Sequence, residues 1–326
     1  MNNSDSPINM FQNPRIRLVK NRKQVWIASL LAIVLSVLGF VFSWLDPSIK
    51  APLRPGIEFT GGTQIKLERE CQSSCSEVKS SIIYESLQNV FNEEDKSENN
   101  FINLAGSKVQ IIDESKSVIL RLPELSLSES ALVIENIKPI LGPLKEGGEL
   151  VDKISASLGG QLYTSSLLSL AIAFVGIAGY ISLRYDRTYA LLALVALVHD
   201  ICIVCGLFSW LGITLQVEVN SLFAVALLTI AGYSVNDTVV VFDRIREARL
   251  AIKGIDLNTQ IDSAVSSTIT RTIYTSITTL LPLVALIFFG GSTLYWFAVA
   301  LATGVVVGSW SSIALSPTLL SLSKNR

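Results

Sequence analysis

Long apolar runs alternate with polar segments along this chain of 326 residues. Because about 20 apolar residues cross the hydrocarbon core of a bilayer, six of these runs are long enough to form membrane-spanning helices. One run precedes a polar segment, residues 46–160, that is too long for a loop, and five runs follow it. The pattern predicts one span, a separate domain and then a five-helix membrane domain at residues 161–316. The predicted spans are Val25–Leu45, Gln161–Leu183, Thr188–Leu211, Val219–Val241, Thr272–Phe289 and Thr293–Leu315.

The polar segment alternates between strand-like and helix-like patterns. Strands are indicated by short β-branched runs bounded by turn residues, and helices by apolar residues that recur at helical spacing. The order β-α-β-β-α-β predicts a ferredoxin-like α+β domain, a fold that hosts many functions and therefore identifies none. The expected strands are Ile57–Leu67, Val109–Ile112, Val118–Leu122 and Glu149–Ser157, and the expected helices are Ser74–Phe91 and Leu127–Leu141.

Both expected helices begin with a capping-box spacing, in which a serine precedes a glutamate by three residues. Ser74 and Glu77 mark the first start, and Ser126 and Glu129 mark the second. The sequence Gly142-Pro143 predicts the end of the second helix.

Composition supports a membrane protein. Hydrophobic residues make up 50% of the chain and charged residues 16%, whereas soluble proteins carry about 25% charged residues. The net charge of −1 gives no reason to expect nucleic-acid binding. Lys and Arg gather in the tails 1–24 and 317–326 and after the second and fourth spans. Since basic residues mark the cytoplasmic side, we expect both termini in the cytoplasm and the polar domain outside it.

The first span is expected to remain as an uncleaved anchor, because it is too long for a signal peptide and lacks a small-residue cleavage site. The four cysteines form two pairs. Cys71 and Cys75 lie in the polar domain, where a disulfide and two free thiols remain equally open. Cys202 and Cys205 lie within a span and are more typical of apolar packing. Neither pair has the additional partners of a zinc site, so no metal is expected.

Asp237 is the most unusual residue of the membrane domain. It lies in an apolar run, where a carboxylate costs about 2.5–3.5 kcal/mol on insertion scales. Tyr233 and Ser234 share its helix face, since positions three and four apart are neighbours. An intramembrane carboxylate marks a functional site more often than a structural ion pair, so Asp237 is our first candidate.

Four stretches together resemble the SecF family of the RND-like superfamily, in order and in spacing. They are GIEFTGG at Gly56–Gly62, LRYDRTYALLALVALVHD at Leu183–Asp200, VNSLFAVALLTIAGYSVNDTVVVFDRIREAR at Val219–Arg249 and TITRTIYTS at Thr268–Ser276. The sequence differs from the family at Glu58, where an aspartate is usual. GIEFTGG is either a binding loop or, more plainly, a strand whose glycines allow close approach.

The resemblance implies a function in protein export and a set of partners. SecF proteins pair with SecD, which supplies six more spans, and act with the SecYEG channel and SecA on preproteins in the plasma (inner) membrane. An internal photosynthetic membrane stays open as the location. The pair uses the proton-motive force, and the resemblance places Asp237 and Arg271 on the proton path. An alternative is a self-standing RND-like exporter of small molecules, which also needs a second six-span half.

Three further residues are candidates for the proton path. His199 and Asp200 lie in the middle of the third span, where the sole histidine is either a proton relay or a packed side chain. Because adjacent helical residues point in different directions, we expect no hydrogen bond between them. Asn236 is expected to bond another helix. For Arg271 the alternative is an anchor that extends to the membrane interface.

Enzyme chemistry is not expected. The run Gly232–Asn236 resembles a nucleophile elbow but lacks the second glycine and lies within a span. The sequence has no phosphate-binding loop, so ATP is not the energy source of this chain. We therefore predict no catalytic residue and no cofactor.

Overall fold

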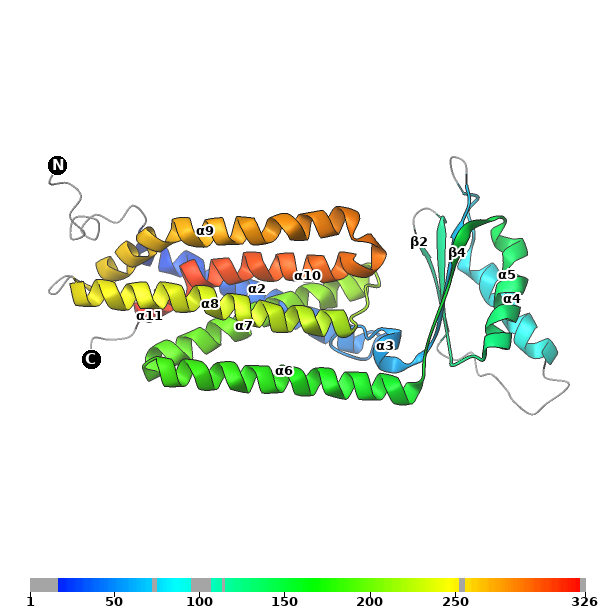
Figure 1. The fold of residues 1–326 in the computed structure, drawn as a ribbon, viewed down its shortest axis with the longest axis horizontal. Coiled ribbons are helices and arrows are strands. Elements are labelled where there is room, and N and C mark those ends of the chain that lie inside the picture. The colour runs from blue at the N-terminus through cyan, green and yellow to red at the C-terminus, as the bar shows by residue number, and fades with distance from the viewer. Residues whose placement is uncertain (1–16, 72–74, 95–106, 113–114, 252–255, 323–326) are drawn as a thin grey trace. The chain divides into compact units, whose positions relative to one another are not determined.

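The computed structural model describes residues 17–71, 75–94, 107–112, 115–251 and 256–322 (Figure 1). The chain divides into two compact units. Met1–Arg54 and Ser166–Arg326 form the first, which we name the helical unit, and Pro55–Ser165 form the second, the sheet unit.

Six helices within the described residues are long and apolar enough to cross a membrane, which confirms the predicted number of spans. The last span is assembled from α10, a π-helix (η3) and α11, and the first is preceded by the short 3-10 helix η2. The bounds are η2 Val19–Asn21, α2 Arg22–Leu45, α6 Ala156–Arg184, α7 Arg187–Thr214, α8 Ser221–Ala251, α9 Leu257–Phe289, α10 Gly291–Trp310, η3 Ser311–Leu315 and α11 Ser316–Leu320.

The predicted start of the fifth span was too late. α9 begins at Leu257 and not at Thr272, because Asp256 caps the helix by accepting a hydrogen bond from the Asn258 amide. The additional turns bury Ile261 and other side chains against the helical core, so packing extends the helix beyond its apolar run.

Close contact between helices in the helical unit depends on glycines. A Cβ atom at Gly206 of α7 would lie 2.5 Å from the backbone Cα of Ser36 on α2. A Cβ atom at Gly304 of α10 would lie 2.3 Å from Ile230 on α8. Small residues of this kind let membrane helices approach closely, where van der Waals packing holds them together.

The sheet unit has the predicted ferredoxin-like fold. Its antiparallel sheet has the order β2-β3-β1-β4, and α4 and α5 cover the same face of it (Figure 1). Ile65 and Leu67 of β1 and Leu120 of β3 are fully buried against Leu87 and Ile137 of the two helices. The bounds are β1 Gly62–Arg69, α4 Ser80–Glu94, β2 Lys108–Ile112, β3 Ser117–Leu122, α5 Leu127–Leu141 and β4 Leu144–Ile154.

The second helix of this unit was predicted correctly. α5 runs from Leu127 to Leu141, and Ser126 and Glu129 form the expected capping box. Gly142 follows at φ 80°, a conformation that glycine adopts without strain. The hydrogen bond to Ser126 lowers the pKa of Glu129 below its ordinary value.

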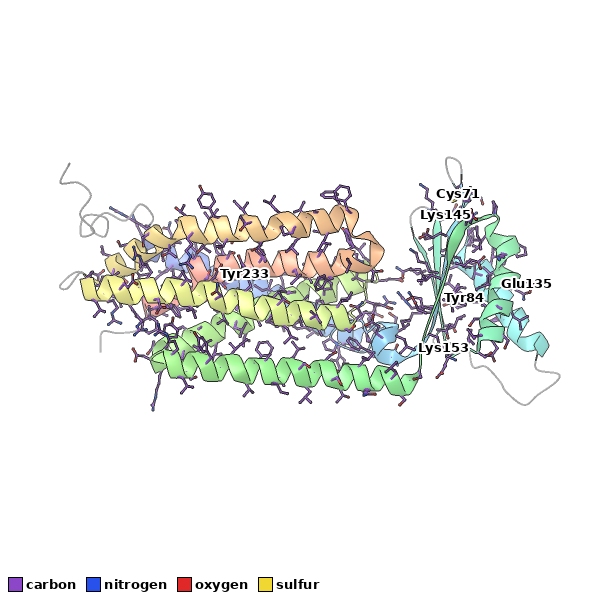
Figure 2. The ribbon with its side chains drawn as sticks, in the orientation of Figure 1. Cys71, Tyr84, Glu135, Lys145, Lys153 and Tyr233 are labelled. Carbon is purple, nitrogen blue, oxygen red and sulfur yellow. A yellow bond between two sulfur atoms is a disulfide. The ribbon has the colours of Figure 1, made fainter. Side chains whose placement is uncertain are left out.

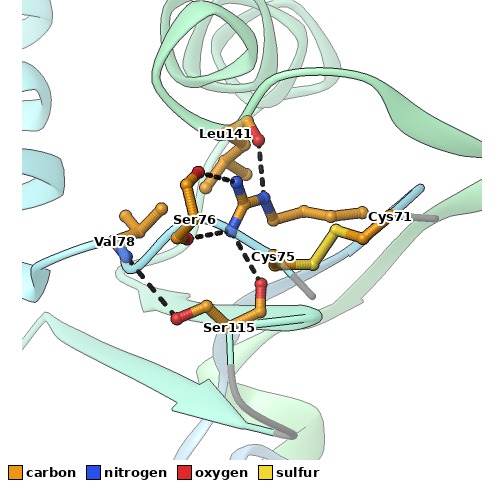
Figure 3. The surroundings of a disulfide bond; sticks show 7 residues. Cys71, Cys75, Ser76, Val78, Ser115 and Leu141 are labelled. Atoms are coloured by element: carbon orange, nitrogen blue, oxygen red, sulfur yellow. Dashed lines mark hydrogen bonds between the residues drawn. A yellow bond between two sulfur atoms is a disulfide. The ribbon is translucent and has the colours of Figure 1, made fainter. Parts of the chain in front are cut away.

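The predicted start of the first helix was wrong. Ser74 lies outside the described residues, Cys75–Lys79 are not helical, and α4 begins only at Ser80. Two contacts hold this stretch away from a helix (Figure 3). The guanidinium of Arg69 donates to both the carbonyl and the hydroxyl of Ser76, each at 2.8 Å. The amide of Val78 donates to the hydroxyl of Ser115.

A disulfide joins Cys71 to Cys75 beside these contacts, which settles the pairing that the sequence left open (Figure 3). Arg69 is 9% exposed, and it also donates to the carbonyls of Leu141 and Ser115. One buried cation therefore joins the end of β1, the residue after the disulfide, the turn before β3 and the end of α5.

The predicted first strand began too early, and the predicted last strand was displaced along the chain, since β4 runs from Leu144 to Ile154. Ile57–Thr60 form a helical turn, α3, and β1 begins at Gly62. Gly61 and Gly62 both have positive φ, and a Cβ on Gly61 would lie 2.6 Å from the Cα of Ala156. The glycines thus serve close approach, as the plainer interpretation proposed, but the residues before them form a helical turn and not a strand. The last strand, β4, ends at Ile154 because α6 begins at Ala156.

Candidate functional site

Polar side chains are buried in the middle of the helical unit, among α7, α8 and η3. Asp200 is fully buried, and its Oδ2 accepts hydrogen bonds of 2.6 Å from the hydroxyls of Ser234 and Ser311. Its other oxygen, Oδ1, lies 2.8 Å from Nδ1 of His199. A hydrogen bond to a carboxylate is strengthened by the charge, so this cluster firmly joins three segments that are distant in sequence.

The prediction that His199 and Asp200 do not bond each other was wrong. Their Cβ atoms diverge on α7, but both side chains are short enough to turn toward each other from the same buried side of the helix. Nδ1 of His199 is thereby occupied, whereas its Nε2 is buried and has no hydrogen-bond partner.

A second set of hydroxyl groups joins α8, α9 and α10. The hydroxyl of Tyr233 donates to Ser276 at 3.1 Å, and Ser276 lies 2.6 Å from Ser309 (Figure 2 labels Tyr233). The Ser276 hydroxyl is also 2.7 Å from the Thr272 carbonyl, to which it donates. Tyr233 and Ser234, adjacent on α8, therefore connect to different helices.

Asp237 lies one turn after these two residues and is 5% exposed. The positive charge of Arg271 and the hydroxyl of Tyr233 both interact with the Asp237 carboxylate. Its Oδ2 is nevertheless buried without a hydrogen-bond partner. Arg271 itself is exposed. Among the ion pairs within 4.0 Å that the described residues form, none joins Asp237 to Arg271.

The structure does not bring Asn236 into the buried cluster. Asn236 is exposed on α8, as are Thr229 and Gly232 on the same side of the helix. The other asparagine of this region, Asn220, accepts a hydrogen bond from the amide of Phe223 and so helps to cap α8.

Sequence reasoning missed the serines that α9 and the last span contribute. Ser311 bonds Asp200, while Ser276 and Ser309 bond each other. The available signal was the run Ser309–Ser316, which places four serines within an otherwise apolar span. Within the ranges that the structure describes, no three His, Cys, Asp or Glu side chains lie close enough to hold a metal ion.

Comparison with known proteins identifies the family. Residues 145–326 match the family described as "Protein export membrane protein SecD/SecF, C-terminal", and residues 49–72 match the "SecD/SecF GG Motif". The latter range includes Gly61 and Gly62.

Curated relatives carry the same name. The chain is 55% identical to the protein translocase subunit SecF of Prochlorococcus marinus over 98% of this chain and 99% of that one. It is 37% identical to the SecF of a Synechocystis species over 94% and 93% of the two chains.

A solved structure supports this assignment. The crystal structure of SecDF, described as a translocon-associated membrane protein, from Thermus thermophilus has a TM-score of 0.75 and 29% identity. The match covers 96% of this chain and 39% of the SecDF chain, so this chain spans about two fifths of that protein. The fold, the motifs and the relatives agree: this chain belongs to the SecF family of protein translocase subunits, multi-pass membrane proteins of the Sec export machinery.

Proposed function

We propose that this chain pairs with a SecD protein and uses the proton-motive force to promote the movement of preproteins that pass through SecYEG with SecA. The observation that carries the proposal is the buried carboxylate of Asp237, one oxygen of which has no hydrogen-bond partner. A carboxylate that only stabilised the fold would be expected to have its acceptors satisfied, because unmet polar groups in an apolar interior are costly.

A proton can change the charge of Asp237 but not that of Arg271, which stays cationic at any relevant pH. Arg271 is near enough to act on the carboxylate, although the two form no direct ion pair here. After loss of its proton, the ionised carboxylate of Asp237 would attract Arg271 and favour an ion pair between the two side chains. After gain of a proton, the neutral acid would release Arg271. Each state favours a different packing of α8 against α9, which converts a local change of charge into movement.

A partner with further spans is supported by the exposed surface of α8 and α9. Asn236, Thr229 and Arg271 are exposed on these two spans, where lipid would leave them poorly solvated. A second helical unit with polar residues would satisfy them. The SecDF chain of similar structure is more than twice as long as the region matched, which leaves room for such a unit.

We further propose that both termini are cytoplasmic and that the sheet unit is on the other side of the plasma membrane. The basic residues around the spans support this orientation. The disulfide between Cys71 and Cys75 supports it independently, since disulfides persist in oxidising compartments outside the cytoplasm.

Export of preproteins in cells depleted of this chain tests the proposal. Wild type, Asp237→Asn and the control Asp243→Asn would be supplied at equal membrane levels. Asp243 is also on α8, but it is partly exposed and paired with Arg184 and Arg246. We expect precursor to accumulate with Asp237→Asn only. Normal export in depleted cells would contradict the proposal and favour the small-molecule exporter.

A further inference from the structure

The cluster around Asp200 contains a pair of titratable groups that is distinct from Asp237. Asp200 and His199 are 0% and 6% exposed and are bonded to each other at 2.8 Å. Both hydroxyls that bond Oδ2 belong to other segments, Ser234 to α8 and Ser311 to the last span. The charge of this pair therefore affects contacts between three segments.

Ser311 is the first residue of the π-helix η3, which interrupts the last span between α10 and α11. A single π-helical turn holds one residue more than an α-helical turn. Such turns are rare overall, and those that occur are often found at functional sites. It also leaves the Ser316 hydroxyl buried without a partner. A regular α-helix is the alternative to such a turn, and a change to it would alter the position of Ser311 relative to Asp200.

We propose that His199 and Asp200 form a second proton-binding centre, and that its charge determines whether Ser311 is held and the π-helix persists. This inference rests on the proposed proton-driven function, which it extends from one carboxylate to two centres. It assigns to His199 and Asp200 a positioning role, because they act on the last span through Ser311.

The number of protons on the pair determines the strength of the Ser311 contact. Both serine hydroxyls donate to Oδ2, so that oxygen carries no proton in the arrangement observed. In the proposed centre one proton is shared between Nδ1 and Oδ1, which lie 2.8 Å apart. Nε2 of His199, which is buried without a hydrogen-bond partner, is then the position at which a second proton is gained or lost. When Asp200 is ionised, the hydroxyls bond a full charge. When Nε2 gains a proton from water and the shared proton passes from Nδ1 to Oδ1, Asp200 becomes a neutral acid, and the two hydroxyl contacts weaken.

Few other charges act on this pair. η3, α10 and α11 contribute no acidic, basic or histidine side chain, although α10 contains Tyr295. α2 carries Arg22 and Lys23 in its first turn, and α7 itself carries the thiols of Cys202 and Cys205. α8 contributes Tyr233 and Asp237, of which Asp237 lies one turn after Ser234.

This position on α8 suggests how the two centres communicate. Ser234 bonds Asp200, and a rotation of α8 that follows a change of charge at Asp237 moves Ser234 as well. α8 and α10 are closely packed at this level, since a Cβ on Gly308 would lie 3.3 Å from the Cβ of Ser234. Displacement of α8 is therefore transmitted to the last span.

The pH dependence of preprotein translocation into membrane vesicles tests the inference. The variants are Asp200→Asn, Ser311→Ala and the control Ser312→Ala, which removes a neighbouring hydroxyl of η3 that bonds only the carbonyl of Ser309. We expect Asp200→Asn and Ser311→Ala to shift the pH profile in the same direction. The double variant should shift it no further, because Ser311 acts through the charge of Asp200, which Asp200→Asn already removes. Ser312→Ala should keep the wild-type profile.

An infrared difference spectrum between high and low pH supplies a direct readout. A carboxylic-acid band that Asp200→Asn removes and Ser311→Ala displaces would support the inference. An unchanged pH profile and band pattern for Asp200→Asn would overturn it. If Asp200→Asn does not accumulate in the membrane, an unchanged profile for Ser311→Ala overturns it equally. Loss of pH dependence in Asp237→Asn alone would leave the proposed function intact, whereas no effect in either aspartate variant would contradict both.

Discussion

Two buried charges of this chain, Arg69 in the sheet unit and Asp237 in the helical unit, have opposite surroundings. In the sheet unit, Arg69 is buried but donates to three carbonyls and one hydroxyl. In the helical unit, Asp237 is buried with one oxygen unpartnered, and His199 has an unpartnered nitrogen. A buried cation that keeps its charge and all of these bonds fixes one structure, because any movement breaks several bonds. An unsatisfied charge remains available to a proton or a partner.

The comparison indicates where each unit can change. The sheet unit has an apolar core closed by Arg69 and the disulfide, so we expect it to move as a rigid body. The helical unit combines glycine contacts with buried hydroxyl groups and the two proposed titratable centres, so we expect changes in packing to occur among its helices. The following substitutions test this contrast.

The largest structural effect is expected for Gly206→Leu. The new side chain would meet the backbone of α2, so the two helices must separate, at a cost of about 3 kcal/mol or more. The matched control is Gly176→Leu on α6, where a Cβ has no neighbour within 4 Å. The melting temperature in detergent should fall sharply for Gly206→Leu and stay unchanged for Gly176→Leu. Equal stability of the two would show that α2 and α7 do not need this contact.

Arg69→Met should destabilise the sheet unit by about 3 kcal/mol, since it leaves four buried acceptors without their donor. Lys66→Met on the same strand is the control, because Lys66 forms only a surface ion pair with Glu68, worth about 1 kcal/mol at most. Hydrogen exchange of the β1 and β3 amides measures the difference. Similar exchange in both variants would contradict a stabilising role of Arg69.

Reduction of the disulfide, or Cys71→Ser with Cys75→Ser, should cost about 2 kcal/mol through loop entropy. We expect faster exchange at the Val78 amide, which follows the loop, and no change in the helical unit. The corresponding replacement of Cys202 and Cys205, two free thiols of α7, is the control. Export that is insensitive to the reductant would agree with a purely structural disulfide.

Ser126→Ala should give the smallest effect, a loss of about 1 kcal/mol from the cap of α5. The pKa of Glu129 is lowered by its hydrogen bond to Ser126, so this stabilisation is present above the unfolded pKa of about 4.3. It is lost as the pH falls through the lower pKa of the folded state. The difference in stability between wild type and variant should therefore decrease as the pH falls through this range, while the bond from the Glu129 amide to the Ser126 hydroxyl keeps part of it. A constant difference at all pH values would exclude this coupling.

Much of the fold could be predicted from the sequence. Apolar runs predicted the six spans, the capping box predicted the start of α5 and Gly142-Pro143 predicted its end, because these signals are local. The start of α4 was misplaced because it depends on Arg69, a residue of another element, and on a disulfide. A local capping pattern contains no information on either.

The site was predicted only in part, for the same reason. Asp237 was identified from its depth in a span, a property of one run of sequence. The bond between His199 and Asp200 depends on side-chain rotation, and the contact of Ser311 depends on a π-helix that no local pattern indicates. Long-range packing determines both.

The most direct test of the account is proton-dependent translocation in vesicles that contain this chain and its SecD partner. An imposed pH gradient would be applied to wild type, Asp237→Asn and Asp237→Glu. We predict that the gradient accelerates translocation with wild type, that Asp237→Asn abolishes the acceleration, and that the titratable Asp237→Glu restores part of it. Full acceleration with Asp237→Asn would contradict the central claim that protonation of this buried carboxylate drives the export step.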